Sequence, residues 1–224
     1  MVRRLSSGTV VVIGLGRFGS ALAETLMGID REVLVIERDP ILVRQMAPRV
    51  TLAVEGDATT IETLQSLGVG DVETAVVAIG SSLEASLLAT SALSEMGVPN
   101  IWAKAVTKEH QRILERVGAH RVVFPELDMG ERVAHLVADA AVKEYFEFAN
   151  GYAISMVDAP PEVHNKSVAE SRLISAWNIA VVGIQPAGTQ DFRPVAASTV
   201  VSPSDRLIIA GGKRDVERFT LGRE

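Results

Sequence analysis

The chain has 224 residues, 47% of them hydrophobic and 22% charged, so it is long and apolar enough to bury one or two sizeable cores. The absence of cysteine excludes disulfide frameworks, zinc ribbons and cysteine nucleophiles, and the four histidines show neither HxH nor HExxH spacing. The net charge of −6 argues against nucleic acid as a partner.

No apolar stretch approaches the roughly 20 residues that a membrane-spanning helix needs. The first residues are basic, but they are not followed by the apolar core and cleavage site of a signal peptide. We therefore expect a soluble, cytoplasmic protein.

Short runs of valine and isoleucine alternate with helix-length amphipathic segments over the first 125 residues. Continuous apolar runs are typical of strands covered on both faces, so the pattern predicts an α/β fold with a Rossmann-like, doubly wound parallel sheet. The predicted strands are 9–13, 32–36, 51–54, 74–79, 101–103 and 121–124, and the predicted helices are 18–28, 41–47, 60–67, 84–96 and 109–117.

The pattern changes after Pro125. Residues 126–148 form the longest helical segment, about 35 Å if continuous, and its two apolar stripes indicate two packing partners. Beyond it, predicted strands 152–157, 179–185 and 205–210 and short helices near 168–173 and at 213–219 indicate a small C-terminal α+β domain. We therefore expect an N-terminal domain over 1–125, a long crossover helix over 126–149 and a C-terminal domain over 150–224.

The sharpest local signal is the GxGxxG loop of Gly14, Gly16 and Gly19, which follows a strand and opens a helix. In such a loop the first glycine permits a tight turn, the second lets the backbone approach a phosphate, and the third lets the helix lie against the strand. The N-terminus of the helix then faces the phosphates with its partial positive charge. The alternative is a glycine turn without a ligand.

Acidic residues follow the next two strands. Glu37 lies 23 positions after the first glycine, where an acid accepts hydrogen bonds from both ribose hydroxyls of an adenosine. It disfavours the 2′-phosphate of NADP, although Arg38 keeps NADP open. Asp39 is more readily a helix N-cap than a second ribose ligand. Asp57 and Thr59 either meet the exocyclic amine of adenine or cap the next helix.

Arg17 stands at the mouth of the loop, where a guanidinium can pair with phosphate oxygens. Loop amides already serve the two phosphates of NAD, so a spare cation fits a longer polyphosphate better; the alternative is a surface arginine on the first helical turn. There is no GxSxG or GxxxxGK[ST] motif, and neither tyrosine at 145 or 152 has a lysine four residues later. A nucleotide site without catalytic groups beside it suggests a sensor.

Five motifs in order carry a resemblance: GLGRFG at 14–19, GDAT at 56–59, VAIG at 77–80, IWAKA at 101–105 and PELDMG at 125–130. With them the chain resembles the cytoplasmic regulatory subunits of Ktr/Trk-type potassium uptake systems, the KtrA/TrkA group of RCK (KTN) proteins. The resemblance covers almost the whole chain, from the N-terminal RCK domain through the crossover helix to the C-terminal RCK domain.

The resemblance implies a nucleotide switch in which ATP favours activation of the transporter and ADP the inactive state, with NAD(H) as a further ligand. It implies that Arg17 meets the γ-phosphate, Glu37 the ribose, Asp57 the adenine and Lys104 the phosphates. The matched motifs add further residues to the nucleotide site: Gly14, Gly16, Phe18, Gly19, Arg38, Ala58, Thr59, Ala78, Ile79 and Gly80.

The same resemblance implies that Glu126 binds Mg²⁺ or another divalent cation between dimer mates. From the residues alone, Glu126 is more readily a first-turn acid that favourably meets the dipole of the predicted helix than a metal ligand. The resemblance further implies an octameric ring of dimers on a membrane-embedded transporter subunit, peripheral to the inner face of the membrane. In some relatives the C-terminal domain binds cyclic di-AMP between two subunits, so the resemblance leaves this ligand open here, although it assigns no residue of this domain to that site.

The expected function is therefore non-enzymatic nucleotide sensing that gates a potassium transporter. The rival reading is an NAD(H)-binding sensor or an NAD-dependent oxidoreductase, which the Rossmann pattern permits. A third is an interaction module whose nucleotide site is vestigial.

Overall fold

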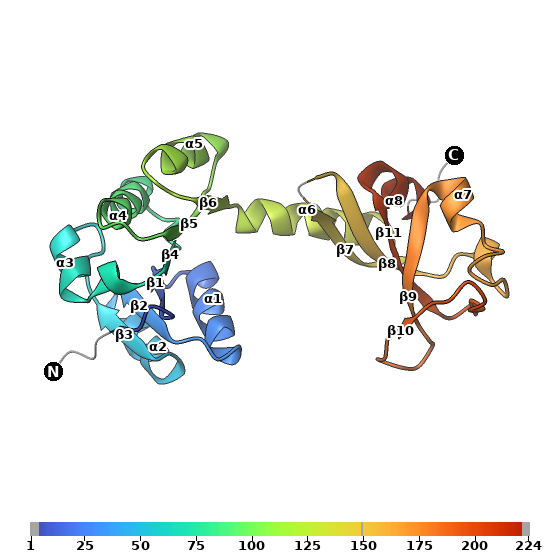
Figure 1. Cartoon of the computed structure of the whole chain (residues 1–224), viewed down its shortest axis with the longest axis horizontal. Coiled ribbons are helices and arrows are strands. Elements are labelled where there is room, and N and C mark those ends of the chain that lie inside the picture. Colours follow the sequence, from blue (N-terminus) through green and yellow to red (C-terminus); the bar gives the residue numbers. More distant parts are fainter. Residues whose placement is uncertain (1–4, 149, 221–224) are drawn as a thin grey trace. The chain divides into compact units, whose positions relative to one another are not determined.

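Two units make up the chain, Met1–Glu126 and Leu127–Glu224, each with a sheet and a hydrophobic core of its own (Figure 1). The computed structural model describes residues 5–148 and 150–220. The division between the units falls at the start of the segment for which a crossover helix is predicted.

The first unit is built on a six-stranded parallel sheet with the strand order β3-β2-β1-β4-β5-β6. Its strands are β1 (Val10–Ile13), β2 (Val33–Glu37), β3 (Leu52–Glu55), β4 (Thr74–Val77), β5 (Asn100–Lys104) and β6 (Arg121–Val123). Its helices are α1 (Arg17–Gly28), α2 (Pro40–Met46), α3 (Ile61–Ser66), α4 (Leu83–Glu95) and α5 (Lys108–Arg116), with short 3-10 turns at η1 (Ala47–Arg49) and η2 (Val69–Asp71). The predicted Rossmann-like, doubly wound α/β fold is confirmed.

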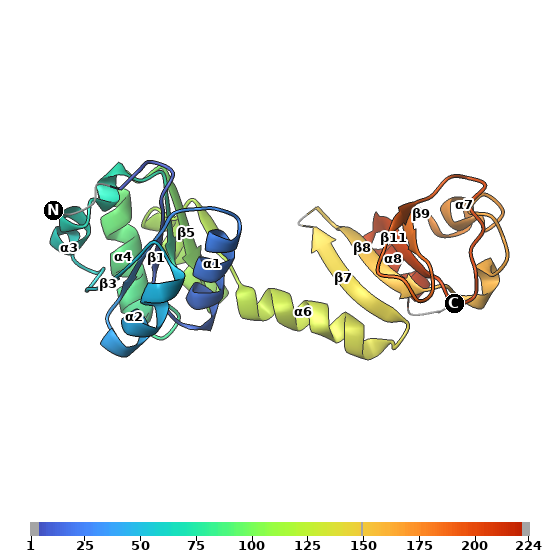
Figure 2. The same ribbon diagram turned by 90° about the horizontal axis from the view of Figure 1, so that it is seen from below.

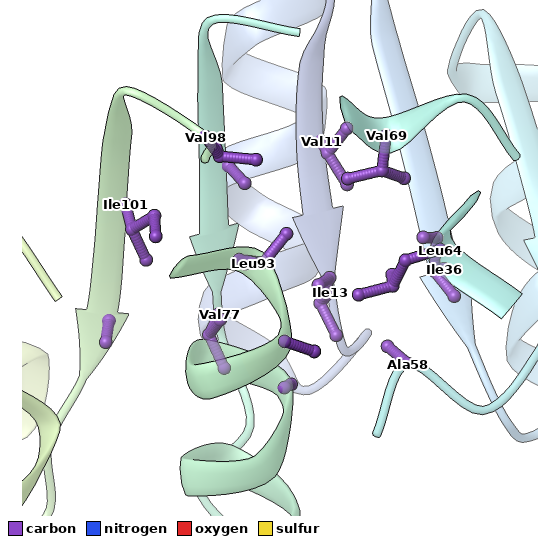
Figure 3. Packing of buried hydrophobic residues seen from close by; sticks show 14 of the residues in the cluster. Val11, Ile13, Ile36, Ala58, Leu64, Val69, Val77, Leu93, Val98 and Ile101 are labelled. Carbon is purple, nitrogen blue, oxygen red and sulfur yellow. The ribbon is translucent and has the colours of Figure 1, made fainter. Parts of the chain in front are cut away.

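Hydrophobic side chains fill both faces of this sheet. On one face Val11 of β1 packs with residues of α3, α4 and α5, and Figure 3 shows Leu64 and Leu93 of these helices turned toward the strands. On the other face Val12 packs with residues of α1 and with Met46 of α2. Adjacent residues of one strand thus enter different cores, and a one-residue slip would exchange them, so packing fixes the register of the strands.

The strand order reverses between β1 and β4. The chain moves outward from β1 to β3 and then returns to pair β4 with the other side of β1. Open α/β sheets bind ligands outside the carboxyl ends of their strands at such a reversal. The loops that follow β1, β2, β3 and β4 meet at this edge, so the topology alone selects the place where a site can form.

The second unit is a five-stranded antiparallel sheet with the order β10-β9-β11-β8-β7 (Figure 1). Figure 2 shows β7, β8, β9 and β11 of this sheet from another side. Its strands are β7 (Val142–Phe148), β8 (Tyr152–Asp158), β9 (Ile179–Gln185), β10 (Arg193–Pro194) and β11 (Arg206–Gly212), and its helices are α7 (Leu173–Trp177) and α8 (Lys213–Thr220), with a 3-10 turn at η3 (Pro161–Val163). Both helices contribute apolar side chains to a core shared with the strands. The predicted small α+β part of the chain is confirmed.

The helix predicted over 126–148 is wrong in its extent. Helix α6 (Pro125–Ala138) ends ten residues earlier, and the rest of the segment is strand β7, paired with β8. The side chain of Asp139 accepts a hydrogen bond from the backbone N–H of Ala141 and closes a turn. The residues beyond are β-branched or aromatic at Val142, Tyr145 and both phenylalanines, and a neighbouring strand is available to them, so they form a strand.

The short helix predicted near 168–173 is also misplaced, because α7 begins only at Leu173. Ser167 and Glu170 exchange hydrogen bonds through backbone and side chain and close a turn instead. Arg172 then adopts a left-handed φ of 55°, which ends that turn. Within residues 5–148 and 150–220, none of the helices combines the length and the hydropathy of a membrane span.

His110 is a titratable side chain buried in the first unit. It is 1% exposed, its Nδ1 accepts a hydrogen bond from the backbone N–H of Val106, and no described residue pairs with its Nε2. Burial lowers the pKa of His110. The unfolded chain therefore takes up this proton at a higher pH than the folded unit does, so stability is full above about pH 6.5 and is lost as the pH falls.

We expect the free energy of unfolding of the first unit to decrease from about pH 7 to about pH 5, and His110→Leu to remove much of that decrease because leucine binds no proton. One such group contributes a slope of at most about 1.4 kcal/mol per pH unit. Urea unfolding at a series of pH values, with Trp102 as the fluorescent reporter in a Trp177→Phe background, measures it. The exposed His120, changed to glutamine, is the control, and a wild-type slope in His110→Leu would contradict the prediction.

Candidate functional site

The glycine loop after β1 brings α1 directly against the end of the strand. Gly14 has a φ of +97°, in the left-handed region that favours glycine. A Cβ at Gly19 would lie 2.0 Å from the carbonyl oxygen of Gly14 and 3.0 Å from the Cβ of Ala78, so no side chain fits there. The fold itself therefore requires these two glycines.

Gly16 is not required by the fold. Its φ of −66° suits any residue, and a Cβ there would have no atom of the chain within 4 Å. Gly16 is the N-cap of α1, no side chain caps this helix, and its first turn holds no acidic residue. Open space beside uncapped N–H groups is the environment that a phosphate needs. Arg17, the next residue, is exposed and forms no ion pair within the described part of the chain.

Glu37 at the end of β2 is bonded to the glycine loop. Its Oε2 accepts a hydrogen bond from the N–H of Leu15 at 2.6 Å, and its Oε1 accepts from the N–H groups of Arg38 and Asp39 at 2.7 and 3.0 Å. Each carboxylate oxygen can accept two hydrogen bonds, so one position remains, on Oε2. Asp39 is the N-cap of α2 and accepts from the N–H of Ile41, as the capping alternative predicted.

Arg38, Asp57 and Thr59 form a cluster across the ends of β2 and β3. Nη2 of Arg38 lies 2.6 Å from Oδ1 of Asp57 and 3.4 Å from Oγ1 of Thr59. Thr59 donates to the same Oδ1 from its backbone N–H at 2.9 Å and from its hydroxyl at 2.7 Å. Hydrogen bonds from Thr59, and to a lesser extent from Arg38, lower the pKa of Asp57 to about 2. The N-cap of α3 is Thr60, so the capping alternative for Asp57 and Thr59 is wrong.

Lys104 and Glu126 meet on the other side of the reversal point. Lys104 ends β5 and is 9% exposed, and its Nζ lies 2.6 Å from Oε1 of Glu126, which follows β6. A Cβ at Gly80 would lie 3.1 Å from the same Nζ, so the loop after β4 lies against it. The hydrogen bond from Lys104 lowers the pKa of Glu126, and the charge of Arg17 acts in the same direction.

The donor set for a metal is sparse. Glu126 supplies one carboxylate, and 60% of its side chain is exposed. Among residues 5–148 and 150–220, no three acidic or histidine side chains gather closely enough to hold an ion. A divalent cation at Glu126 would therefore take most of its ligands from outside this chain.

The other predicted site residues lie largely in the cores. Phe18 packs against the core on the α1 face, and Ala58 and Ala78 are each 4% exposed within the two cores. Ile79 lies against the loop, because a Cβ at Gly14 would be 3.2 Å from its Cγ1. Ala58 and Ala78 therefore offer a ligand little but their backbone, whereas the side chains of Phe18 and Ile79 remain partly exposed.

A groove of about 190 Å³ beside the loop was not predicted from the sequence. Its lining residues are Leu15, Ser20, Leu42, Gln45, Met46 and Arg49. They come from the glycine loop, α1, α2 and η1 and have the composition of ordinary surface helices. No sequence signal identifies such a groove, because only the packing of α2 beside α1 creates it.

Residues 10–125, from β1 to just beyond β6, match the model of the TrkA-N domain. The chain belongs to the TrkA-N family. It is 34% identical over 216 residues to the Ktr system potassium uptake protein A of Bacillus subtilis (strain 168), which is 96% of this chain and 97% of that protein. It is 32% identical over 208 residues to the Ktr system potassium uptake protein C of the same organism, covering 93% and 94%. The predicted resemblance to the KtrA/TrkA group is confirmed.

Solved structures share the fold of this TrkA-N protein. The GsuK channel bound to NAD aligns with a TM-score of 0.68 at 16% identity over 97% of the chain, and the chain spans 40% of the length of that channel. At this identity the likeness shows the fold alone. The TrkA-N domain of the inner membrane protein ybaL from Escherichia coli is 26% identical, with a TM-score of 0.53 over 58% of this chain and 97% of that domain.

Gly19 and Gly16 of the loop give opposite expectations for stability when each is changed to alanine. Gly19→Ala should lower the free energy of unfolding of the first unit by about 3 kcal/mol or more, because the new Cβ collides with the Gly14 carbonyl. Gly16→Ala should cost about 1 kcal/mol or less, since alanine fits there and is only a poorer N-cap. Urea unfolding of both variants measures the difference. Equal losses would contradict this assignment of fold and ligand roles.

Proposed function

We propose that this protein is a cytoplasmic regulatory subunit of a Ktr-type potassium uptake system, without enzymatic activity, and that it distinguishes ATP from ADP at the glycine loop. The observation that carries the proposal is the N-terminus of α1, which no side chain caps and which is open above Gly16, with Arg17 beside it and without an ion-pair partner among the described residues. Relatives named as Ktr potassium uptake proteins match nearly the full chain, which supports the class of partner.

An adenine nucleotide would lie along the carboxyl edge of the sheet. The N–H groups that follow Gly16 would hold its phosphates, with Arg17 at the third phosphate and Lys104 close by. The free position on Oε2 of Glu37 would accept a hydrogen bond from a ribose hydroxyl, and Asp57 would accept one from the adenine amine. These groups follow neighbouring parallel strands, which supports a single ligand that spans them.

The proposed switch rests on a difference in affinity. A nucleotide shifts the balance between two shapes only by binding one of them more tightly. A tenfold preference is about 1.4 kcal/mol per site, and in an assembly that changes as a unit the preferences of all sites combine. The proposed assembly is an octameric ring of dimers at the inner face of the membrane, bound to a membrane-embedded transporter subunit. ATP would favour the activating shape of this ring and ADP the inactive one.

Glu126 is the proposed ligand for Mg²⁺ in the ATP form. Mg²⁺ retains waters and is commonly held by one or two carboxylates together with substrate phosphates, so a single carboxylate per chain is sufficient. Binding would draw Glu126 away from Lys104 and release that ammonium toward the phosphates. The cation would thereby add to the attraction for a triphosphate.

Arg17→Gln should reduce the preference for ATP over ADP by about tenfold or more, because a charge-assisted hydrogen bond contributes roughly 1.5–3 kcal/mol. Gly16→Ala should weaken both nucleotides. Calorimetric titration with ATP, ADP and NADH measures these affinities. Arg31→Gln is the matched control, because it removes the same charge just before β2, at the opposite edge of the sheet.

An unchanged ATP-to-ADP ratio in Arg17→Gln would refute the role of Arg17. Failure of the wild-type protein to bind any adenine nucleotide would refute nucleotide sensing and favour a vestigial site. Tight NADH binding with weak ATP binding would favour the NAD(H) sensor or the NAD-dependent oxidoreductase. Cyclic di-AMP belongs in the same titration series, as the test of a ligand for the second unit.

Glu126→Gln should abolish the gain in ATP affinity that Mg²⁺ produces, because the carboxylate is lost. ATP binding without Mg²⁺ should not weaken, since Lys104 loses its anionic partner and is free for the phosphates. Titration with and without Mg²⁺ measures both effects, with the exposed Asp128→Asn as the charge-matched control on α6. A Mg²⁺ effect that persists in Glu126→Gln would exclude Glu126 as the ligand.

A further inference from the structure

Arg38 has a fixed direction that its place in the sequence does not explain. It directly follows Glu37, the proposed ribose ligand, yet its guanidinium points to the loop after β3, where Nη2 meets Asp57 at 2.6 Å and Thr59 at 3.4 Å. Its side chain nevertheless remains 56% exposed. The guanidinium is thus held through Nη2, while more than half of the surface of the side chain stays exposed to solvent.

An arginine beside a ribose acid has two uses, and this direction separates them. One is to pair with a 2′-phosphate, as in sites for NADP. That use requires the guanidinium on the ribose side, near Glu37, which here is bonded to Leu15, Arg38 and Asp39 through backbone N–H groups alone. The other use is to stack a planar guanidinium on an aromatic ring. Arg38 is held by Asp57 and Thr59, on the side where the proposed function places the base.

Asp57 keeps one oxygen available in this cluster. All three hydrogen bonds that it accepts from Arg38 and Thr59 end on Oδ1, so no described residue donates to Oδ2. The pKa of about 2 keeps this carboxylate ionised at every physiological pH. An amine hydrogen of a base can therefore bond to Oδ2 without breaking the ion pair, and Arg38 does not have to leave before a ligand binds.

We propose that Arg38 is the base-holding residue of the site: its guanidinium, fixed by Asp57 and Thr59, is the platform on which the adenine rests. The inference depends on the proposed nucleotide site and adds a residue that acts on the base alone. Because Asp57 and Thr59 hold the guanidinium in place before binding, little side-chain freedom remains to be lost when the base arrives.

Arg38 should therefore contribute equally to every adenine nucleotide, whatever its phosphates. A cation–π contact at an exposed site is worth about a 2- to 5-fold change in affinity. Arg38→Gln should weaken ATP, ADP and NADH by this same factor and leave the ATP-to-ADP ratio unchanged. Arg38→Lys should weaken them similarly, because lysine keeps the charge but lacks the planar group. Inorganic tripolyphosphate, which has no base, should bind both variants as it binds the wild type.

The experiment is calorimetric titration of wild type, Arg38→Gln, Arg38→Lys and the control Arg31→Gln with ATP, ADP, NADH, NADPH and tripolyphosphate. Unchanged melting temperatures without ligand establish that the variants fold, as expected for an exposed ion pair. A common loss for ATP, ADP and NADH with tripolyphosphate unaffected supports the proposal.

Four outcomes would overturn it. Unchanged or tighter adenine nucleotide binding by Arg38→Gln removes the platform role. An equal loss for tripolyphosphate shows that Arg38 acts through its charge on phosphates, and a loss confined to NADPH shows a 2′-phosphate contact. If the wild-type protein binds no adenine nucleotide, the proposed function fails first and the inference falls with it, whereas the other outcomes leave that function standing.

Discussion

The close approach of Gly19 to the carbonyl of Gly14 is the constraint on which the site depends. A Cβ would lie 2.0 Å from that oxygen, so α1 can start at the end of β1 only if no side chain intervenes. The contact aims the first N–H groups of α1 along the carboxyl edge of the sheet. Glu37 then bonds the loop to β2 by accepting a hydrogen bond from the N–H of Leu15. The position of the glycine loop is therefore fixed by β1, β2 and α1 together.

Charge is distributed unevenly along this edge. Glu37, at the end of β2, is already compensated by three backbone N–H groups, and Asp57, in the loop after β3, by Arg38 and Thr59. Beyond the reversal point Lys104 is paired with Glu126, while Arg17 has no ion-pair partner in the described part of the chain. Of these groups, the cation without an ion-pair partner among the described residues therefore lies at the mouth of the glycine loop, where the proposed phosphates would lie.

The sequence predicts most of this arrangement because the first unit obeys simple rules. Apolar runs fit strands covered on both faces, and the GxGxxG spacing reports a contact that only glycine permits. The sequence mispredicts residues 142–148, because their apolar spacing suits a helix as well as a strand. Pairing with β8 makes this segment a strand. The direction of Arg38 and the three amides on Glu37 are equally invisible, since both depend on how neighbouring strand ends are placed.

The uneven compensation gives the two ends of the proposed site different tasks. Groups paired before a ligand arrives change little when it binds, so they set affinity for a nucleotide without distinguishing one state of its phosphates from another. An unpaired cation gains most from each added negative charge, because no existing partner must be released. Under the proposed function, discrimination between ATP and ADP would therefore belong at Arg17, and the exchangeable pair of Lys104 and Glu126 would amplify it. The same separation would let recognition of the base strengthen or weaken without altering the response to the third phosphate.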